Sequence, residues 1–124
     1  MPGLSDSPGG DGGDGDMRER REPALLDASH LDRQVLGDSG LRAELLHLYA
    51  TRLEQLQAKL GVAHGSERRE AAHALKGASL AVGAFALARL CEGIECSEPE
   101  DAVAFECVLA ATRVRVAALL GGHR

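Results

Sequence analysis

The sequence is poor in the residues that build β-sheets and that stack on nucleic-acid bases. It contains no Trp, one Tyr and two Phe among its 124 residues. β-branched aliphatic residues are also few, with one Ile and seven Val against 20 Ala and 19 Leu. This balance disfavours β-sheet and favours helix. So few aromatic side chains also leave no surface on which bases could stack.

Charge, hydropathy and cysteine content narrow the classes of protein further. The net charge of −5 provides no basic field for nucleic acid. No apolar run approaches the roughly 18 residues of a membrane span, and the polar, acidic N-terminus does not resemble a signal peptide. Three cysteines without paired spacing suit a reducing compartment. The sequence therefore predicts a cytoplasmic protein that binds neither nucleic acid nor membrane.

The length fits one domain preceded by a tail. Residues 1–23 include the run from Ser5 to Asp16, which holds only Gly, Asp, Ser and Pro and has nothing to bury. Such a composition is typical of disorder. Apolar periodicity begins near Leu25. We therefore expect a disordered acidic tail over residues 1–23 and a folded domain over residues 24–122.

The periodicity within the domain predicts five helices. A short helix over about 28–36 would bury Leu31, Val35 and Leu36. Four longer helices would cover about 40–61, 66–82, 84–96 and 98–120. Four amphipathic helices with short links predict an all-α, up-down antiparallel four-helix bundle, with the short N-terminal helix at one end.

Individual residues predict how these helices begin and which side they bury. Ser66 is a candidate N-cap for the helix over 66–82, and Ser97 to Glu100 form a capping box for the last helix. Gly83 marks a break between two helices. The apolar stripe of the 40–61 helix is Leu41, Leu45, Leu48, Tyr49, Leu53, Leu56 and Leu60.

One histidine does not fit a plain bundle. On a helical wheel, His73 points away from the apolar stripe of its helix, near the middle. Gly77 follows one turn later, although glycine inside a helix costs about 1 kcal/mol relative to Ala. The missing side chain leaves room above the imidazole for a large partner. Lys76 supplies a cation close to that ring.

Phosphoryl transfer is the chemistry that this arrangement favours. A neutral imidazole is a good nucleophile near pH 7. The sequence predicts no acid–base partner next to His73, and Lys76 would screen the charge of a phosphoryl group on the ring. Metal binding has little support, because the chain contains neither His-Glu-x-x-His nor Cys-x-x-Cys.

The residues around His73 also resemble a family signature. The run His73-Ala74-Leu75-Lys76-Gly77-Ala78-Ser79, followed by Val82-Gly83-Ala84, resembles that of the histidine-containing phosphotransfer (HPt) domain. The resemblance extends over about residues 28–120. It implies that His73 is phosphorylated, that Lys76 assists and that Gly77 clears the approach. Phe85 departs from those members that carry a polar side chain there.

The resemblance further implies a phosphoryl carrier, and not an autonomous enzyme, in a two-component phosphorelay. Its partners would be response-regulator receiver domains and a hybrid histidine kinase. The receiver would bring Mg²⁺, so this chain needs no cofactor of its own. Partner contacts are expected from Arg69, Glu70 and Leu80 on the side of His73, with Leu25 and Leu26 as further candidates.

Two other classes of function fit the sequence less well. In a histidine kinase an acid follows the phosphorylated histidine, whereas Ala74 follows here, and no glycine-rich ATP-binding segment is present. A non-catalytic adaptor bundle that binds a signalling partner explains the fold and the acidic tail. It does not explain why Gly77 and Lys76 accompany His73.

Overall fold

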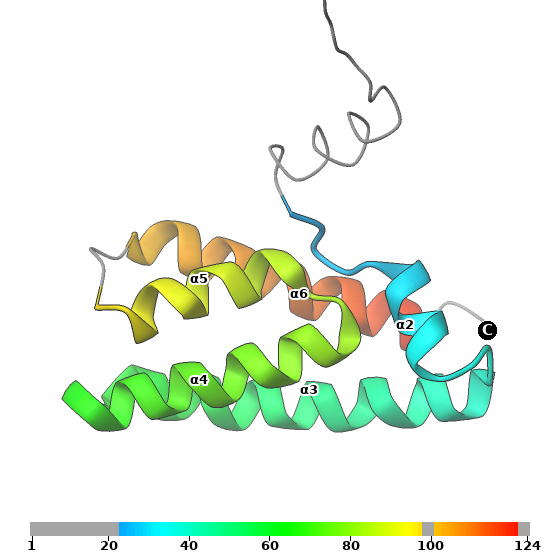
Figure 1. Cartoon of the computed structure of the whole chain (residues 1–124), viewed down its shortest axis with the longest axis horizontal. Coiled ribbons are helices and arrows are strands. Elements are labelled where there is room, and N and C mark those ends of the chain that lie inside the picture. Colours follow the sequence, from blue (N-terminus) through cyan, green and yellow to red (C-terminus); the bar gives the residue numbers. More distant parts are fainter. Residues whose placement is uncertain (1–22, 98–100, 122–124) are drawn as a thin grey trace, which may run out of the picture.

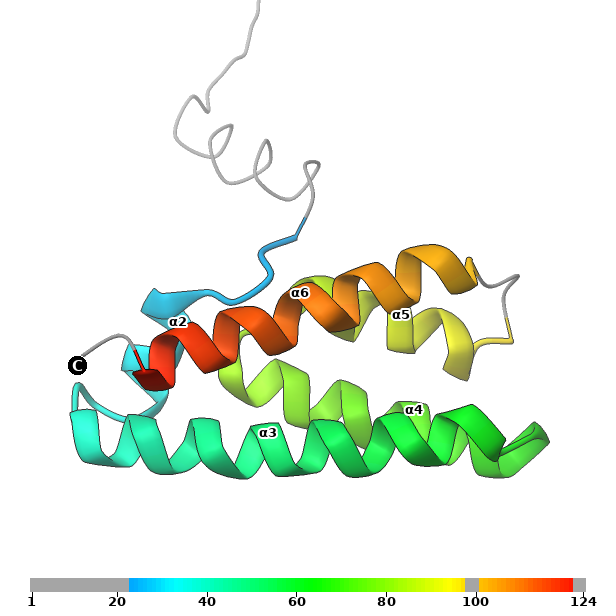
Figure 2. The same cartoon turned by 180° about the vertical axis from the view of Figure 1, so that it is seen from behind.

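The computed structural model of this chain describes residues 23–97 and 101–121, which contain five helices and no strand. The four longer helices run alternately up and down, and the short one lies at one end (Figures 1 and 2). The expected all-α antiparallel bundle with an extra N-terminal helix is therefore confirmed. The expected tail lies, except for Pro23, outside the described residues. The helices are α2 (Ala28–Gln34), α3 (Ser39–Val62), α4 (Gly65–Val82), α5 (Phe85–Glu95) and α6 (Ala102–Gly121).

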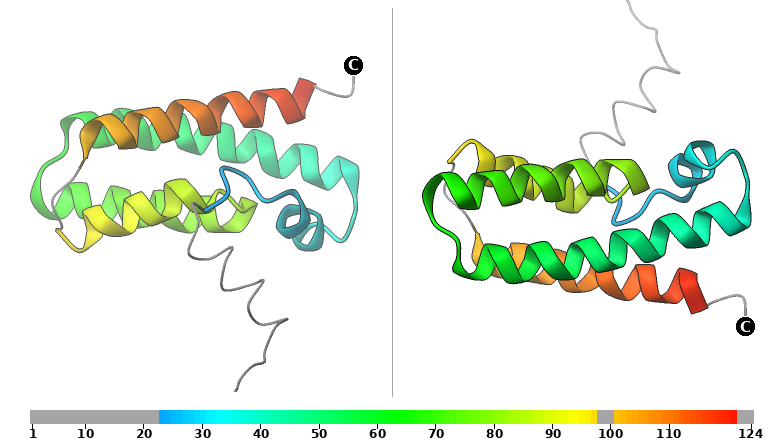
Figure 3. Two further views of the ribbon diagram at one scale, coloured as in Figure 1. Left: turned by 90° about the horizontal axis from the view of Figure 1, so that it is seen from above. Right: turned by 90° about the horizontal axis from the view of Figure 1, so that it is seen from below.

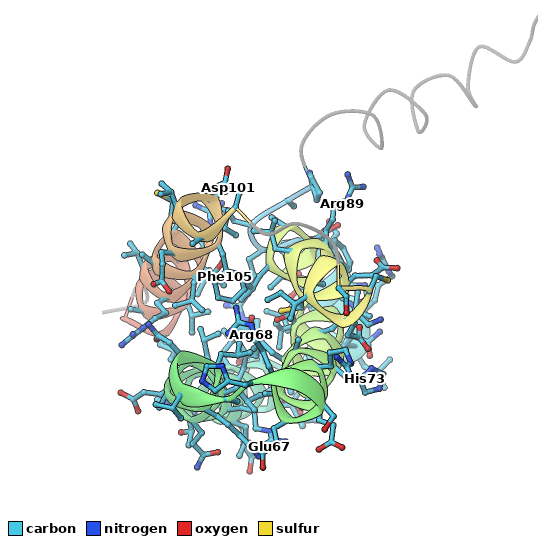
Figure 4. The ribbon with its side chains drawn as sticks, turned by 90° about the vertical axis from the view of Figure 1, so that its left-hand side faces the viewer. Glu67, Arg68, His73, Arg89, Asp101 and Phe105 are labelled. Carbon is cyan, nitrogen blue, oxygen red and sulfur yellow. The ribbon has the colours of Figure 1, made fainter. Side chains whose placement is uncertain are left out.

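The long helices surround one core built mainly of leucine. Helix α4 packs against α3 and α5, while α6 packs against α3 and α5 on the other side (Figure 3). Seen along the bundle, α4 and α6 therefore occupy opposite corners, and Phe105 of α6 points into the space between the helices (Figure 4). The largest fully buried apolar side chains are Leu31, Leu46, Leu53, Leu75, Leu87, Leu109, Val82 and Val116.

A buried polar pair joins α3 to α4. The hydroxyl groups of Tyr49 and Ser79 lie 2.8 Å apart and share a hydrogen bond inside the core. Burial raises the pKa of Tyr49 to about 12, so the phenol stays neutral at physiological pH. A buried hydroxyl without a partner is costly. The pair therefore favours one particular register of α4 against α3.

The corner between α4 and α5 depends on Gly83. This residue ends α4 in the left-handed conformation, with φ of 85°. Its carbonyl accepts a hydrogen bond from the Asp27 N–H at 2.9 Å, which ties the segment before α2 to the corner. A Cβ at this position would lie 3.0 Å from the Asp27 carbonyl oxygen. Both the dihedral angle and the close approach therefore require glycine.

Three leucines that periodicity placed on buried faces are exposed. Leu36 is 91% exposed, because α2 ends at Gln34 and Leu36 occupies the following turn with φ of 55°. On α3, Leu41 and Leu48 are exposed by 50% and 64%, while Leu46 is buried. The buried side of α3 is therefore turned away from the predicted stripe, because Leu46 outside that stripe packs into the core in place of Leu41 and Leu48.

Two helix starts also differ from the expectation. Helix α4 begins at Gly65 after His64, so Ser66 is not its N-cap. Helix α6 begins at Ala102, and the Asp101 carboxylate accepts a hydrogen bond from the Ala104 N–H at 3.0 Å. An aspartate therefore caps α6, whereas Glu98 to Glu100 of the expected capping box lie outside the described residues.

The replacement Gly83→Ala should destabilise the bundle by about 1–3 kcal/mol, because alanine resists positive φ and its Cβ would meet Asp27. Gly77→Ala is the matched control. Position 77 is inside α4, and a Cβ there would meet nothing within 4 Å, so this change should stabilise by about 1 kcal/mol. Urea unfolding followed by circular dichroism measures both. Equal effects of the two substitutions would contradict the role assigned to Gly83.

Candidate functional site

The candidate site lies on the outer surface of α4, where α4 packs against α5. His73 points away from the core and its side chain is 72% exposed (Figure 4). The exposure follows from helical geometry, because the buried face of α4 is formed by residues such as Ala72, Leu75 and Ser79. The predicted outward orientation of His73 is therefore confirmed.

The imidazole has an acidic partner that the sequence did not predict. Nδ1 of His73 is hydrogen-bonded to Oε2 of Glu95, the last residue of α5. The expectation of an imidazole without an acid–base partner was wrong. The two residues are 22 positions apart on different helices, so no helical spacing could relate them. The helix that follows Gly83 carries two acids, Glu92 and Glu95, and periodicity does not single out Glu95.

Lys76 completes a three-residue arrangement. Its Nζ lies 2.6 Å from Oε1 of Glu95, so one carboxylate holds the imidazole with one oxygen and the ammonium with the other. The hydrogen bond from Lys76, with a smaller contribution from His73, lowers the pKa of Glu95 below its ordinary value. The hydrogen bond to Glu95 likewise raises the pKa of Lys76. Both charges therefore persist at neutral pH.

This arrangement leaves one nitrogen of the ring available. A carboxylate can only accept a hydrogen bond, so neutral His73 keeps its proton on Nδ1 and presents the Nε2 lone pair to solvent. The bond also restricts rotation of an otherwise exposed ring. The site can thus offer a fixed, nucleophilic nitrogen on an open surface.

The surface around the ring is open on the side of Gly77. A Cβ placed on Gly77 meets nothing within 4 Å. Arg69 and Glu70 are exposed on the turn before His73, and Leu80 is 43% exposed one turn after Lys76. Leu25 is half-buried, and Leu26 is buried at 6% exposure and belongs to the core, so Leu26 is not available to a partner.

A shallow hollow adjoins this surface between α4 and α5. It extends from Lys76 and Leu80 across to the segment before α2. Phe85 lines the hollow and packs edge-on against His30, with ring centroids 5.1 Å apart. Its lining residues are Pro23, Lys76, Leu80, Phe85, Ala88, Arg89 and Glu92.

Other reactive side chains do not form a second centre in the described part of the chain. Cys91 is buried, and burial raises the pKa of its thiol to about 12, while Cys96 and Cys107 are exposed. Residues 23–97 and 101–121 contain no group of three or more His, Cys, Asp or Glu side chains placed to hold a metal ion. No helix among these residues is both long and apolar enough to span a membrane.

Comparison with known proteins agrees with this geometry. The sequence profile of the Hpt domain matches residues 40–119, and the chain therefore belongs to the Hpt domain family. The structure is similar to the crystal structure of histidine phosphotransferase ShpA from Caulobacter crescentus. The TM-score is 0.67 at 28% sequence identity, over 77% of this chain and 89% of that one. A search of curated protein sequences gave no match.

The tautomer of His73 can be measured directly. Long-range ¹H–¹⁵N NMR spectra of the neutral rings should show the His73 proton on Nδ1, because Glu95 accepts it. His47, exposed on α3, gives the reference for a ring in water. In Glu95→Ala the His73 pattern should shift toward that of His47. Identical patterns for His73 before and after this substitution would show that Glu95 does not set the tautomer.

Proposed function

We propose that this chain is a phosphoryl carrier, in which His73 accepts a phosphoryl group from an aspartate of one receiver domain and passes it to an aspartate of another. The main support for the proposal is the environment of the His73 ring. It is 72% exposed, its Nδ1 is held by Glu95 and its Nε2 faces open solvent. Hpt proteins are phosphocarriers of phosphorelays that interact with receiver domains and histidine kinases. Membership of the family supports the same role here.

The proposed reaction needs little chemistry from this chain. The Nε2 lone pair of His73 attacks the phosphorus of the aspartyl phosphate, a P–N bond forms, and the P–O bond to the aspartate breaks. The aspartate leaves as a carboxylate, and the proton on Nδ1 stays between the ring and Glu95. The reverse sequence of bond changes delivers the group to the next aspartate. Such transfers depend mainly on positioning and charge stabilisation.

Lys76 is proposed to serve both the resting and the phosphorylated ring. Its ammonium lies on Glu95 in this structure, 2.6 Å from Oε1. An ammonium has three N–H donors, so it can keep this contact and also donate to a phosphoryl oxygen on Nε2. Lys76 would thereby balance the charge of Glu95 before transfer and part of the phosphoryl charge after it.

The receiver is proposed to approach over Gly77. The open space at Gly77 and the hollow beside Leu80 form one accessible surface next to the ring. Arg69 and Glu70 flank that surface and are the proposed polar contacts of a partner. Mg²⁺ is proposed to arrive on the receiver, so that catalysis depends on the partner, a receiver or the kinase, and no cofactor binds to this chain.

The modification site is tested by replacing His73 with glutamine. A phosphorylated receiver supplied with Mg²⁺ should label the wild-type chain through an acid-labile bond, whereas His73→Gln should take no label because the nucleophilic nitrogen is gone. His47→Gln is the matched control, since His47 is also an exposed histidine on a long helix. Helical circular dichroism should be unchanged in both variants.

Label that survives His73→Gln would refute the site. Binding of the receiver without any labelling of the wild-type chain would instead favour the non-catalytic adaptor.

The approach of the partner is tested at Gly77. Gly77→Gln should slow transfer from the receiver by about tenfold or more, because a long side chain would occupy the space above the ring. The same variant should unfold at higher urea concentration, since glycine is the poorer helix former. Gly77→Ala separates the two effects by adding only a methyl group. Unchanged transfer in Gly77→Gln would rule out this direction of approach.

A further inference from the structure

Helix α6 is apolar on the side that faces away from the core. Its buried side is formed by Phe105, Leu109, Thr112 and Val116. On the opposite side Val103 and Val114 are exposed by 73% and 69%. A surface helix normally carries charged or polar residues on its outer face, and a helix that is apolar all round is normally buried. The outer face of α6 therefore has the composition of a covered surface.

The spacing of the outer residues is that of a helix–helix seam. Val103, Cys107, Ala110 and Val114 follow one another at intervals of four, three and four residues, and all four are exposed. An alternation of four and three keeps apolar residues in line along a paired helix. We call these four residues the α6 seam. Alanine and cysteine in its middle would allow a second helix to approach closely.

We propose that the α6 seam binds a second copy of this chain, with the two α6 helices antiparallel about a two-fold axis. In that arrangement Val103 lies opposite Val114 of the second copy, and Cys107 lies opposite Ala110 of the second copy. Each contact then occurs twice, as a two-fold interface requires. A second copy fits this surface because the charges beside the seam are complementary to those of the same flank on another copy.

Those charges are Glu106 and Arg113. At 100° per residue both lie on the same flank of the seam, seven residues apart. A two-fold axis places this flank of one copy along the same flank of the other, so Glu106 of each copy meets Arg113 of the other. Sliding the pair by one heptad would instead bring the two Arg113 side chains together. The charges therefore favour the register that also aligns the valines.

Arg113 is anchored to α3 and keeps donors for such a contact. Its Nη1 donates a hydrogen bond to Oε1 of Gln57 on α3 at 2.8 Å, which restricts the conformation of the Arg113 side chain. A guanidinium has five N–H donors, so others remain for a carboxylate. Because one helix pair buries less than the roughly 1,200–2,000 Å² of a standard interface, we expect a weak, reversible dimer.

This interface would leave the phosphotransfer site open. Helix α6 lies at the corner of the bundle opposite α4, and His73 points outward on the far side (Figure 4). A dimer formed through α6 would therefore present its two His73 side chains on opposite ends of the assembly. The α6 seam contains no residue of that site, so the dimer does not rest on the proposed function.

Sedimentation equilibrium of the full chain under reducing conditions tests the proposal. The wild-type chain should show a reversible monomer–dimer equilibrium between micromolar and submillimolar concentrations. Val114→Glu should raise the dissociation constant at least about tenfold, because it buries an unpaired carboxylate in the seam. Val62→Glu is the matched control, since Val62 is 75% exposed at the end of α3 and outside the seam. The dissociation constant of the Val62→Glu dimer should equal that of the wild-type chain.

A charge exchange tests the register. Arg113→Glu should weaken the dimer about fivefold, and adding Glu106→Arg should restore it, because the pairs re-form with reversed signs. Circular dichroism checks that each variant is folded.

A wild-type chain that stays monomeric throughout, or a dimer that survives Val114→Glu, would overturn the proposal. A double variant no tighter than Arg113→Glu would overturn the antiparallel register. Labelling of His73 in the wild-type chain is measured separately, and its absence there would count against the proposed function alone.

Discussion

One carboxylate organises the exposed chemistry of this bundle. Glu95 accepts a hydrogen bond from Nδ1 of His73 and pairs with Nζ of Lys76 at 2.6 Å. A surface imidazole that is 72% exposed would otherwise sample several rotamers. Because Glu95 comes from α5 and the other two residues from α4, the site exists only where these helices pack correctly. The packing of the core therefore becomes a condition for the reactivity of a group outside it.

Both faces of helix α4 carry residues that lower the stability of the helix. Its outer face carries Gly77, which costs about 1 kcal/mol relative to alanine. Its inner face carries Ala71, Ala72 and Ser79, which are small and contribute less apolar area than leucines would. What these residues provide is close approach of the neighbouring helices, and Ser79 adds the buried hydrogen bond to Tyr49. Helix α4 is thus stabilised mainly by its neighbours.

The sequence sufficed for features that depend on one helix at a time. His73, Lys76 and Gly77 lie within one turn of each other, so helical periodicity predicted their common surface and the outward direction of the ring. It could not predict Glu95, because the contact across α4 and α5 depends on the packing of two helices. Leu46 and Leu48 show the same limit. Periodicity placed Leu48 on the apolar stripe and left Leu46 out of it, and only the placement of α4 and α6 decides that Leu46 is buried and Leu48 exposed.

The arrangement of the bundle also determines which helices connect the α6 seam to the surface around His73. Helix α6 packs mainly against α3 and α5, and the same two helices pack against α4. The α6 seam is therefore connected to the site mainly through α3 and α5. Of these, α5 alone supplies an atom to the site, the carboxylate oxygen on Nδ1. A displacement of α5 would thus act on His73 and Lys76 through the carboxylate of Glu95, which both side chains share.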